Sequence, residues 1–239
     1  MAEFLLPGLI FLFAGFIQGM TGFGAGLVAM PLLCLIMEVK SAVSLCILNG
    51  LIVTITLAVE LRHLFDWRKI LPLLAGSIPG VWLGTVLLKQ ADQLMVKSLL
   101  GIVLVAYSGF NLIFQPKPIR MRTGWGYLAG FSSGTITAMV SAGGPPVIIY
   151  TMLMGWNKEV IRATLTGFFV TNGAITAAVH AANGFIPATL LHVCAVTFPF
   201  VWAGSVLGSH VSRRINQRLF LQTVYLLLIG IGIIMIAAS

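Results

Sequence analysis

The chain has 239 residues, of which 59% are hydrophobic and only 8% are charged. A soluble protein could not bury that much apolar surface, so the composition excludes a water-soluble globular domain and predicts a helical membrane protein. The formal net charge is +8, but the basic residues lie between or near the ends of apolar runs. That distribution indicates contact with membrane lipids and argues against binding to nucleic acid.

Ten apolar segments follow one another along the chain, separated by short polar breaks. Most are long enough to cross a bilayer as a helix. Two are short and begin in glycine-rich breaks, so they either cross fully or re-enter as half-helices. The expected segments are 4–20, 22–37, 41–61, 69–88, 96–115, 124–141, 143–155, 160–181, 186–208 and 217–237. The predicted fold is an all-α polytopic membrane protein with Gly/Pro-broken or re-entrant helices at 22–37 and 143–155.

Part of the sequence occurs twice, which predicts two repeats of five segments each. Residues 78–87 (IPGVWLGTVL) match residues 198–207 (FPFVWAGSVL) at six of ten positions. Two shorter echoes occur in the same order: Gly15-Phe16 with Gly130-Phe131, and Glu38-Val39 with Glu159-Val160. We expect a first repeat at 1–115, a linker at 116–123 and a second repeat at 124–239.

The distribution of Lys and Arg predicts the orientation, because cytoplasmic loops carry an excess of basic residues. Eleven basic residues fall on one predicted side: Arg62, Arg68, Lys69, Lys117, Arg120, Arg122, Lys158, Arg162, Arg213, Arg214 and Arg218. Only Lys40, Lys89 and Lys97 fall on the other. We expect a multi-pass protein of the cytoplasmic membrane with both termini outside. The sequence Glu38-Val39 then lies outside the cell, and the matching sequence Glu159-Val160 lies in the cytoplasm. The two repeats are therefore expected to be inverted.

The glycine-rich breaks before the two short segments are the predicted site of a small anionic substrate. Repeated glycine and paired proline break helices and leave backbone N–H groups unpaired, and helix N-termini favour anions. By the inverted symmetry, the two breaks should approach each other near the midplane. The backbone candidates are Gly19, Gly24, Gly134, Gly143 and Gly144, and the hydroxyl candidates are Thr21, Ser133 and Thr135. For any single glycine, close helix packing is the alternative.

Other polar residues within the predicted spans are few. Asn49 and Asn172 lie in the third segment of each repeat, where asparagine indicates either a substrate cavity or a helix–helix hydrogen bond, with equal support. His180 and His192 lie towards the outer boundary, where packing is favoured over a proton relay. No titratable residue falls clearly in mid-membrane, which favours uniport without a coupled ion.

The sequence contains no catalytic motif, nucleotide-binding loop or metal-spaced His/Cys cluster, so we expect neither an enzyme nor a bound metal or cofactor. Small-residue stripes occur at Gly76, Gly80 and Gly84 and again at Gly204 and Gly208. They indicate close helix packing within one protomer, which we favour, or the seam of a homodimer.

The pattern Gly15-x-x-x-Gly19-x-x-Gly22-x-Gly24-Ala25-Gly26-x-x-x-x-Pro31, with a second copy through Gly143-Gly144-Pro145-Pro146, resembles the TauE/SafE sulfite-exporter family over nearly the whole chain. The resemblance implies a secondary transporter of a small sulfur oxyanion, sulfite or an organosulfonate such as sulfoacetate. It implies export, and alternating access is the expected mechanism. The alternatives are an anion channel and an importer of another small organic anion. The family often has a glycine triplet where this chain has Gly24-Ala25-Gly26.

Overall fold

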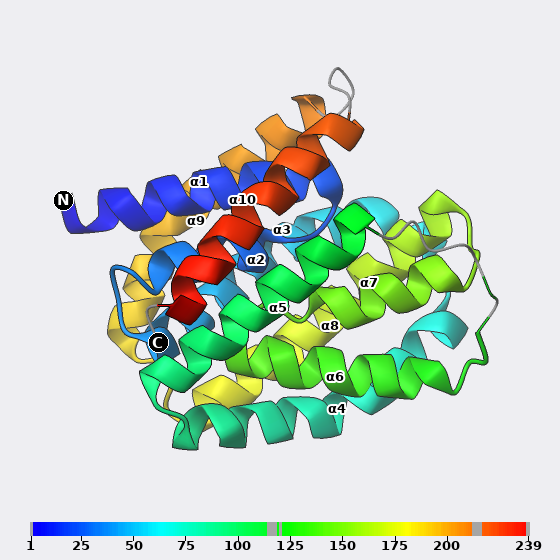
Figure 1. Ribbon diagram of the computed structural model, residues 1–239, viewed down its shortest axis with the longest axis horizontal. Coiled ribbons are helices and arrows are strands. Elements are labelled where there is room, and N and C mark those ends of the chain that lie inside the picture. Colours follow the sequence, from blue (N-terminus) through cyan, green and yellow to red (C-terminus); the bar gives the residue numbers. More distant parts are fainter. Residues whose placement is uncertain (1, 114–118, 120, 212–216, 238–239) are drawn as a thin grey trace.

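The computed structural model describes residues 2–113, 119, 121–211 and 217–237, and this part of the chain is helical, with no strand (Figure 1). The helices are α1 (Ala2–Thr21), α2 (Ala25–Leu33), α3 (Val39–Leu61), α4 (Trp67–Gln90), α5 (Gln93–Ile113), α6 (Trp125–Val140), α7 (Gly144–Leu153), α8 (Lys158–Ala182), α9 (Ala188–Val211) and α10 (Gln217–Ala237). A 3-10 turn, η1 (Arg62–Leu64), joins α3 to α4.

Each predicted apolar segment corresponds to one helix, and the expected all-helical fold is confirmed. Within the described ranges, six helices are long and apolar enough to cross a membrane: α3, α4, α5, α8, α9 and α10. The chain is therefore a multi-pass membrane protein. Half of the predicted linker 116–123 lies outside the described residues, as do the predicted cytoplasmic residues Lys117, Arg120, Arg213 and Arg214. The side chain of Arg218 also falls outside that description.

The two short segments form short helices. Helix α2 has 9 residues and α7 has 10. At 1.5 Å per residue each is about 14–15 Å long, roughly half the thickness of the hydrocarbon core of a bilayer. Neither crosses the membrane as a helix on its own, so each is a half-helix that begins inside the protein.

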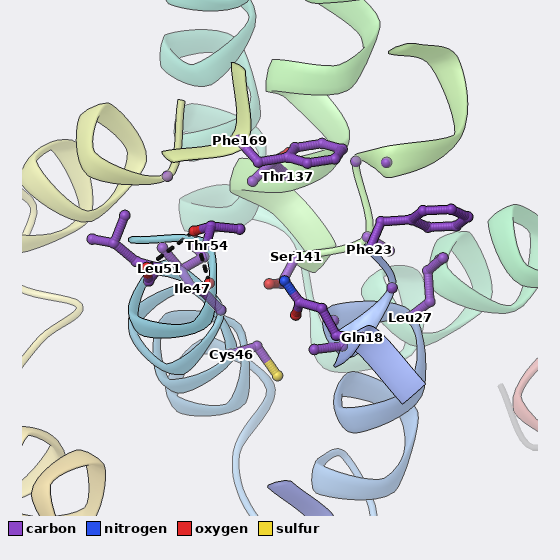
Figure 2. A pocket seen from close by; sticks show the side chains of 18 of the residues that line it. Gln18, Phe23, Leu27, Cys46, Ile47, Leu51, Thr54, Thr137, Ser141 and Phe169 are labelled. Atoms are coloured by element: carbon purple, nitrogen blue, oxygen red, sulfur yellow. Dashed lines mark hydrogen bonds between the residues drawn. The ribbon is translucent and has the colours of Figure 1, made fainter. Parts of the chain in front are cut away.

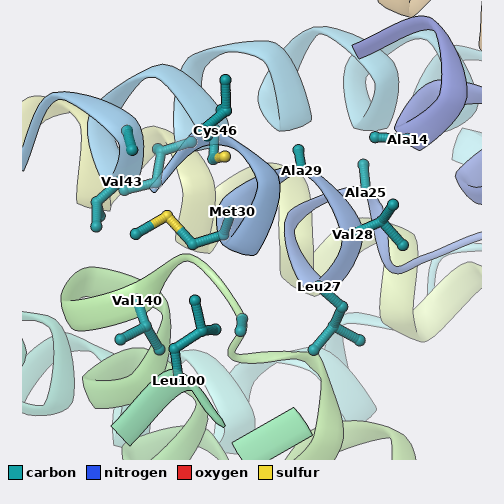
Figure 3. Packing of buried hydrophobic residues seen from close by; sticks show 14 of the residues in the cluster. Ala14, Ala25, Leu27, Val28, Ala29, Met30, Val43, Cys46, Leu100 and Val140 are labelled. Atoms are coloured by element: carbon teal, nitrogen blue, oxygen red, sulfur yellow. The ribbon is translucent and has the colours of Figure 1, made fainter. Parts of the chain in front are cut away.

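Helix α2 lies in the interior of the molecule. Its residues Ala25, Leu27, Val28, Ala29 and Met30 are all buried. Figure 3 shows them packed among side chains of α3, α5 and α6, including Val43, Leu100 and Val140. Burial among protein helices is what allows the chain to break within the membrane, because the ends of a half-helix would otherwise face lipid.

Two long helix pairs, α1 with α9 and α4 with α6, lie at opposite edges of the molecule (Figure 1). Both are held by backbone-to-backbone contact at glycine. A Cβ atom added at Gly19 would overlap the carbonyl oxygen of Ser205, and one added at Gly134 would overlap that of Ser77. Gly80 and Gly208 meet the carbonyl oxygens of Phe131 and Phe16 in the same way. The small-residue stripes therefore pack helices within the chain.

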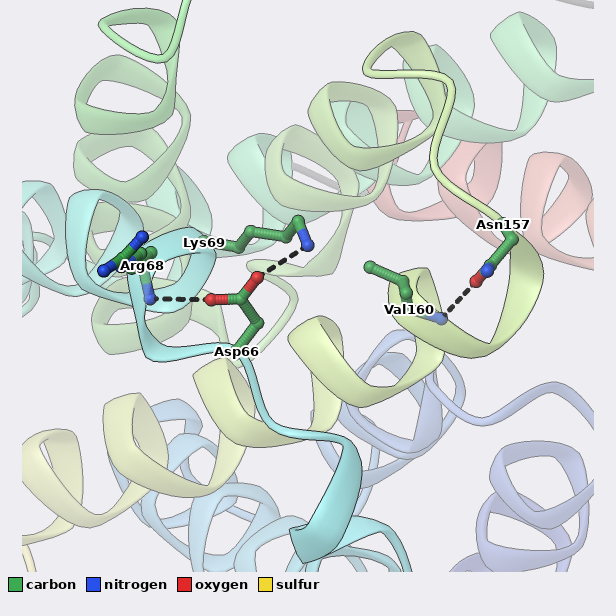
Figure 4. Close-up of polar contacts among 5 residues, drawn as sticks. All are labelled: Asp66, Arg68, Lys69, Asn157 and Val160. Carbon is green, nitrogen blue, oxygen red and sulfur yellow. Dashed lines mark hydrogen bonds and ion pairs between the residues drawn. The ribbon is translucent and has the colours of Figure 1, made fainter.

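Side-chain caps mark where two of the long helices begin (Figure 4). The Asp66 carboxylate accepts a hydrogen bond from the Arg68 amide at the start of α4 and pairs with Lys69 at 2.6 Å. The Asn157 side chain accepts from the Val160 amide at the start of α8. Both satisfy donors that a helix leaves unpaired. The hydrogen bond from Lys69 lowers the pKa of the Asp66 carboxyl, so this cap stays ionised at neutral pH.

Candidate functional site

The two breaks in the chain meet. The first lies between α1 and α2, where Gly24 adopts a left-handed conformation with φ of 99° that favours glycine. The second lies between α6 and α7, where Ser141 has φ of 53°. A Cβ atom added at Gly26 would overlap the carbonyl oxygen of Ser141. Backbone from the two halves of the sequence is thus in direct contact at the starts of α2 and α7.

A cavity of about 100 Å³ lies where the breaks meet, with room for a small anion or several water molecules. We call it the central cavity. Figure 2 shows the side chains of Gln18 and Ser141 pointing towards one another, with Phe169 above them and Phe23 to the right. Residues of α3 and α8 complete the lining, among them Gly50, Thr54, Asn172 and Gly173. None of the described lining residues carries a charged side chain.

The half-helices bring hydrogen-bond donors and positive dipole ends to the central cavity. The first three amides of α2, at Ala25, Gly26 and Leu27, have no carbonyl partner within their own helix. Helix α7 is poorer in donors, because Pro145 and Pro146 follow Gly144 and proline has no N–H. Both N-termini still carry about half a positive charge from the helix dipole. The cavity therefore suits an anion, and α2 supplies more of the donors.

A chain of side-chain hydrogen bonds supports the start of α7. The Ser133 hydroxyl donates to the carbonyl oxygen of Gly143. The Thr137 hydroxyl donates to the carbonyl oxygen of Ser133 at 2.7 Å, and Asn172 Nδ2 donates to Thr137 Oγ1 at 3.4 Å. Gly143 fits here because an added Cβ would overlap Thr137 Oγ1. The network joins α6, α7 and α8 beside the cavity.

The ten predicted site residues lie in different environments, and only some of them line the central cavity. Gly24, Gly143, Gly144 and Asn172 line the central cavity. Ser133 lies behind it, holding the Gly143 carbonyl. Gly19 and Gly134 are at helix–helix contacts. The Thr135 hydroxyl donates to Phe131 of its own helix, and Asn49 bonds to Thr197 of α9 through both its amide nitrogen and its amide oxygen. Thr21 lines a neighbouring cavity.

Our sequence-based selection missed several lining residues: Gln18, Gly50, Thr137, Ser141 and Gly173. One signal was available for two of them. Asn49-Gly50 recurs as Asn172-Gly173 in the third segment of the second repeat, and both glycines line the cavity from α3 and α8. A Cβ atom added at Gly50 would meet nothing within 4 Å. This glycine therefore leaves space in the cavity and does not serve close helix packing.

A second cavity of about 420 Å³, which we call the basic vestibule, adjoins the first. Lys158 and Arg162 line it, together with Thr21 and Tyr107, and neither basic side chain forms an ion pair with a described residue. Phe23 lines both cavities. Phe23 therefore lies where a neutral central cavity adjoins a compartment that attracts anions.

His180 holds neighbouring helices together and does not face the central cavity. It is fully buried, its Nδ1 lies 3.1 Å from the Ser44 hydroxyl and its Nε2 lies 3.1 Å from the carbonyl oxygen of Ala138. The carbonyl can only accept, so Nε2 carries the proton and Nδ1 accepts from Ser44. The ring joins α3, α6 and α8 and does not line the central cavity. His192, in contrast, is exposed.

The fold and the central cavity define a class: a polytopic helical membrane protein in which the N-termini of two half-helices meet at an internal, uncharged cavity suited to an anion. The model of the sulfite exporter TauE/SafE family matches residues 8–235. The chain belongs to this family of membrane transporters. Comparison with curated proteins and with solved structures gave no match.

Proposed function

We propose that the protein is a secondary transporter that exports a small sulfur oxyanion, sulfite or an organosulfonate, across the cytoplasmic membrane by alternating access. The observation that carries the proposal is the meeting of the α2 and α7 N-termini at the central cavity, in a chain of the sulfite exporter family. Helix N-termini favour anions without a charged side chain, which lets the substrate leave again. The ligands in this proposal are Gly24, Gly143, Gly144 and Asn172.

Alternating access requires two halves that rock against each other, and we propose that these are inverted repeats at 1–115 and 124–239. The helix packing supports this. If α1–α5 and α6–α10 are equivalent repeats, α1 corresponds to α6 and α9 corresponds to α4. The packed pair α1–α9 then corresponds to the packed pair α6–α4, and the pairs α3–α8 and α5–α10 each correspond to themselves. The echoed residues also have equivalent environments: Val81 and Val201 are fully buried, whereas Trp82 and Trp202 are exposed.

The proposed substrate path runs from the cytoplasm through the basic vestibule to the central cavity. The charge distribution of the sequence assigns Lys158 and Arg162 to the cytoplasmic side. In Figure 1, α1 begins and α10 ends at the same end of the bundle, whereas α4 begins at the other. This arrangement supports the two termini lying together on the outer side. Phe23 is then the inner barrier that must move for the anion to enter.

Reconstituted protein in proteoliposomes tests the proposal. We expect uptake of sulfite or an organosulfonate that saturates with concentration and accelerates when the same anion is present on the opposite side. Flux without saturation or exchange would indicate the alternative, an anion channel with a continuous pore. Transport of small carboxylates with no response to sulfur oxyanions would favour the other alternative, an importer of another organic anion.

A further inference from the structure

We infer that the central cavity prefers a singly charged sulfur oxyanion that carries its own hydrogen-bond donor, such as hydrogen sulfite or a hydroxyalkanesulfonate. Dianions and anions without a donor should bind less well. The inference rests on the proposed function and narrows its substrate class. Two independent observations carry it: an unpaired acceptor in the cavity wall, and the small amount of positive charge that the wall offers.

The unpaired acceptor is the amide oxygen of Asn172. The side chain lines the central cavity and is only 1% exposed, and its Oδ1 has no hydrogen-bond partner among the described residues. Buried polar atoms in proteins almost always have a partner. A carboxamide oxygen can only accept. Any group that satisfies Asn172 Oδ1 must therefore donate a hydrogen.

The hydrogen-bond network fixes which end of the Asn172 amide faces Thr137 and which end is left without a partner. Thr137 donates its hydroxyl hydrogen to the Ser133 carbonyl, which has no hydrogen to give. Thr137 Oγ1 can then only accept from Asn172, so the NH₂ group of Asn172 faces Thr137. The opposite orientation would place two acceptors against each other. The oxygen is thus the end of the amide that has no partner among the described residues.

Asn49 shows that this is a property of Asn172 and not of intramembrane asparagine in general. It occupies the related position in α3 and is also fully buried, but its oxygen accepts from the Thr197 hydroxyl and its nitrogen donates to Leu45 and Thr197. Leu45 of α3 and Thr197 of α9 thus give both ends of the Asn49 amide a partner. Among the described residues, no neighbouring helix does the same for Asn172 Oδ1.

The charge of the cavity points to a monoanion. The described lining has no Lys, Arg or His, so the positive potential comes from the dipoles of α2 and α7. Each helix N-terminus is equivalent to about half an elementary charge, and two together offset about one negative charge. A dianion would leave its second charge without a compensating charge in the described lining.

Hydrogen sulfite meets both requirements, since it carries one negative charge and one hydrogen, whereas sulfite carries two charges and no hydrogen. Isethionate, which is 2-hydroxyethanesulfonate, also meets both. Propane-1-sulfonate has the same charge and nearly the same shape as isethionate, with a methyl group in place of the hydroxyl. Sulfoacetate is doubly charged at neutral pH. These five anions separate the requirement for a donor from the requirement for one charge.

Binding to purified protein should be measured by calorimetry for the wild type, Asn172→Leu and Asn183→Leu. Asn183 is a matched control because it lies at the exposed end of the same helix. We expect isethionate to bind the wild type and Asn183→Leu about tenfold more tightly than propane-1-sulfonate, because a site built to pair with a donor rejects an analogue without one. In Asn172→Leu the two sulfonates should bind equally.

Sulfite binding provides a second measurement that needs no variant, in buffers below and above the pH at which hydrogen sulfite loses its proton. We expect the affinity for total sulfite to fall as the dianion replaces hydrogen sulfite, while isethionate affinity stays constant. If the cavity is too small for both larger sulfonates, or if Asn172→Leu does not fold, the sulfite series in wild-type protein decides.

Equal binding of isethionate and propane-1-sulfonate to the wild type, or tighter binding of sulfite dianion or sulfoacetate, would overturn the inference. A bound water molecule would then satisfy Asn172 Oδ1, and the proposed function would stand. Absence of binding by every sulfur oxyanion, with binding of a carboxylate instead, would overturn the proposed function itself.

Discussion

Ser133 of α6 donates its hydroxyl hydrogen to the carbonyl oxygen of Gly143, the residue before α7, and so ties the start of the half-helix to a membrane-embedded neighbour. The Ser133 side chain is fully buried and does not itself line the central cavity. Its contribution to binding is therefore through the position of the Gly143-Gly144 backbone.

Replacing Ser133 with alanine should weaken anion binding by about 1 kcal/mol, the typical net value of one hydrogen bond. The Gly143 carbonyl would lose its side-chain partner and α7 its fixed start. Calorimetric titration with the transported anion measures the effect. Ser132→Ala is the matched control, because the adjacent serine is partly exposed and lies outside the central cavity. Equal losses in both variants would contradict this role for Ser133.

Gly50→Ala should reduce binding without reducing stability. The added methyl group would meet nothing within 4 Å and would project into the central cavity. Alanine also favours a helix over glycine by about 1 kcal/mol, so the melting temperature should stay the same or rise. Gly109→Ala in α5 is the control, since its Cβ also meets nothing and it does not line the cavity. Unchanged affinity in Gly50→Ala would show that this part of α3 does not face the bound anion.

Gly80→Ile together with Gly208→Ile should prevent folding. Each side chain would be driven into the backbone of a partner helix, at Phe131 and Phe16 respectively. Size-exclusion chromatography in detergent should show aggregated protein. Gly230→Ile is the control, because its added Cβ meets nothing within 4 Å. Recovery of a folded, active monomer from the double variant would instead indicate that the stripes join two protomers, as in the homodimer that the sequence leaves open.

These glycines show how much of the structure could be predicted from sequence. Helix positions followed from apolar runs, because the bilayer fixes the length of a crossing segment. The meeting of the two breaks followed from the repeat. The role of each glycine did not follow. Gly19 and Gly24 occur in one motif, yet one packs against Ser205 and the other begins a half-helix at the cavity. Which face of a helix meets a neighbour depends on tertiary packing, which residue spacing alone does not encode.

Transport of isethionate should be driven by membrane potential and not by a pH gradient. The described lining of the central cavity has no titratable acid or base apart from Cys46. A monovalent anion leaving an inside-negative cell gains about 2.3 kcal/mol per 100 mV. A potassium–valinomycin potential across proteoliposomes provides the measurement. Isethionate is the right probe because its charge does not change near neutral pH, whereas that of sulfite does.

The same assay tests His180. Glutamine has both a donor and an acceptor, so His180→Gln can keep the bonds to Ser44 and Ala138. We expect potential-driven flux to remain in this variant and in His192→Gln. Flux that follows a pH gradient at zero potential and disappears in the two variants would refute uniport and make these histidines a proton path.

Cysteines introduced at Arg122 and Asn183 should react with a membrane-impermeant reagent from opposite sides of the membrane. Both residues are exposed, and Asn183 lies at the end of α8 remote from Lys158. The excess of basic residues places Arg122 in the cytoplasm, so only Asn183→Cys should label in intact cells. The three native cysteines are buried and should give little background. Labelling of both positions from one side would contradict the inverted arrangement.

Because of Pro145 and Pro146, the two half-helices offer different numbers of hydrogen-bond donors to an anion in the central cavity. Helix α7 brings its dipole to the ligand but few N–H groups, whereas α2 brings both. Dipole attraction falls gradually with distance, but hydrogen bonds are lost within a fraction of an ångström. When the two halves of such a transporter move apart, the anion would therefore remain with α2, and the surface that slides past the ligand would be that of α7.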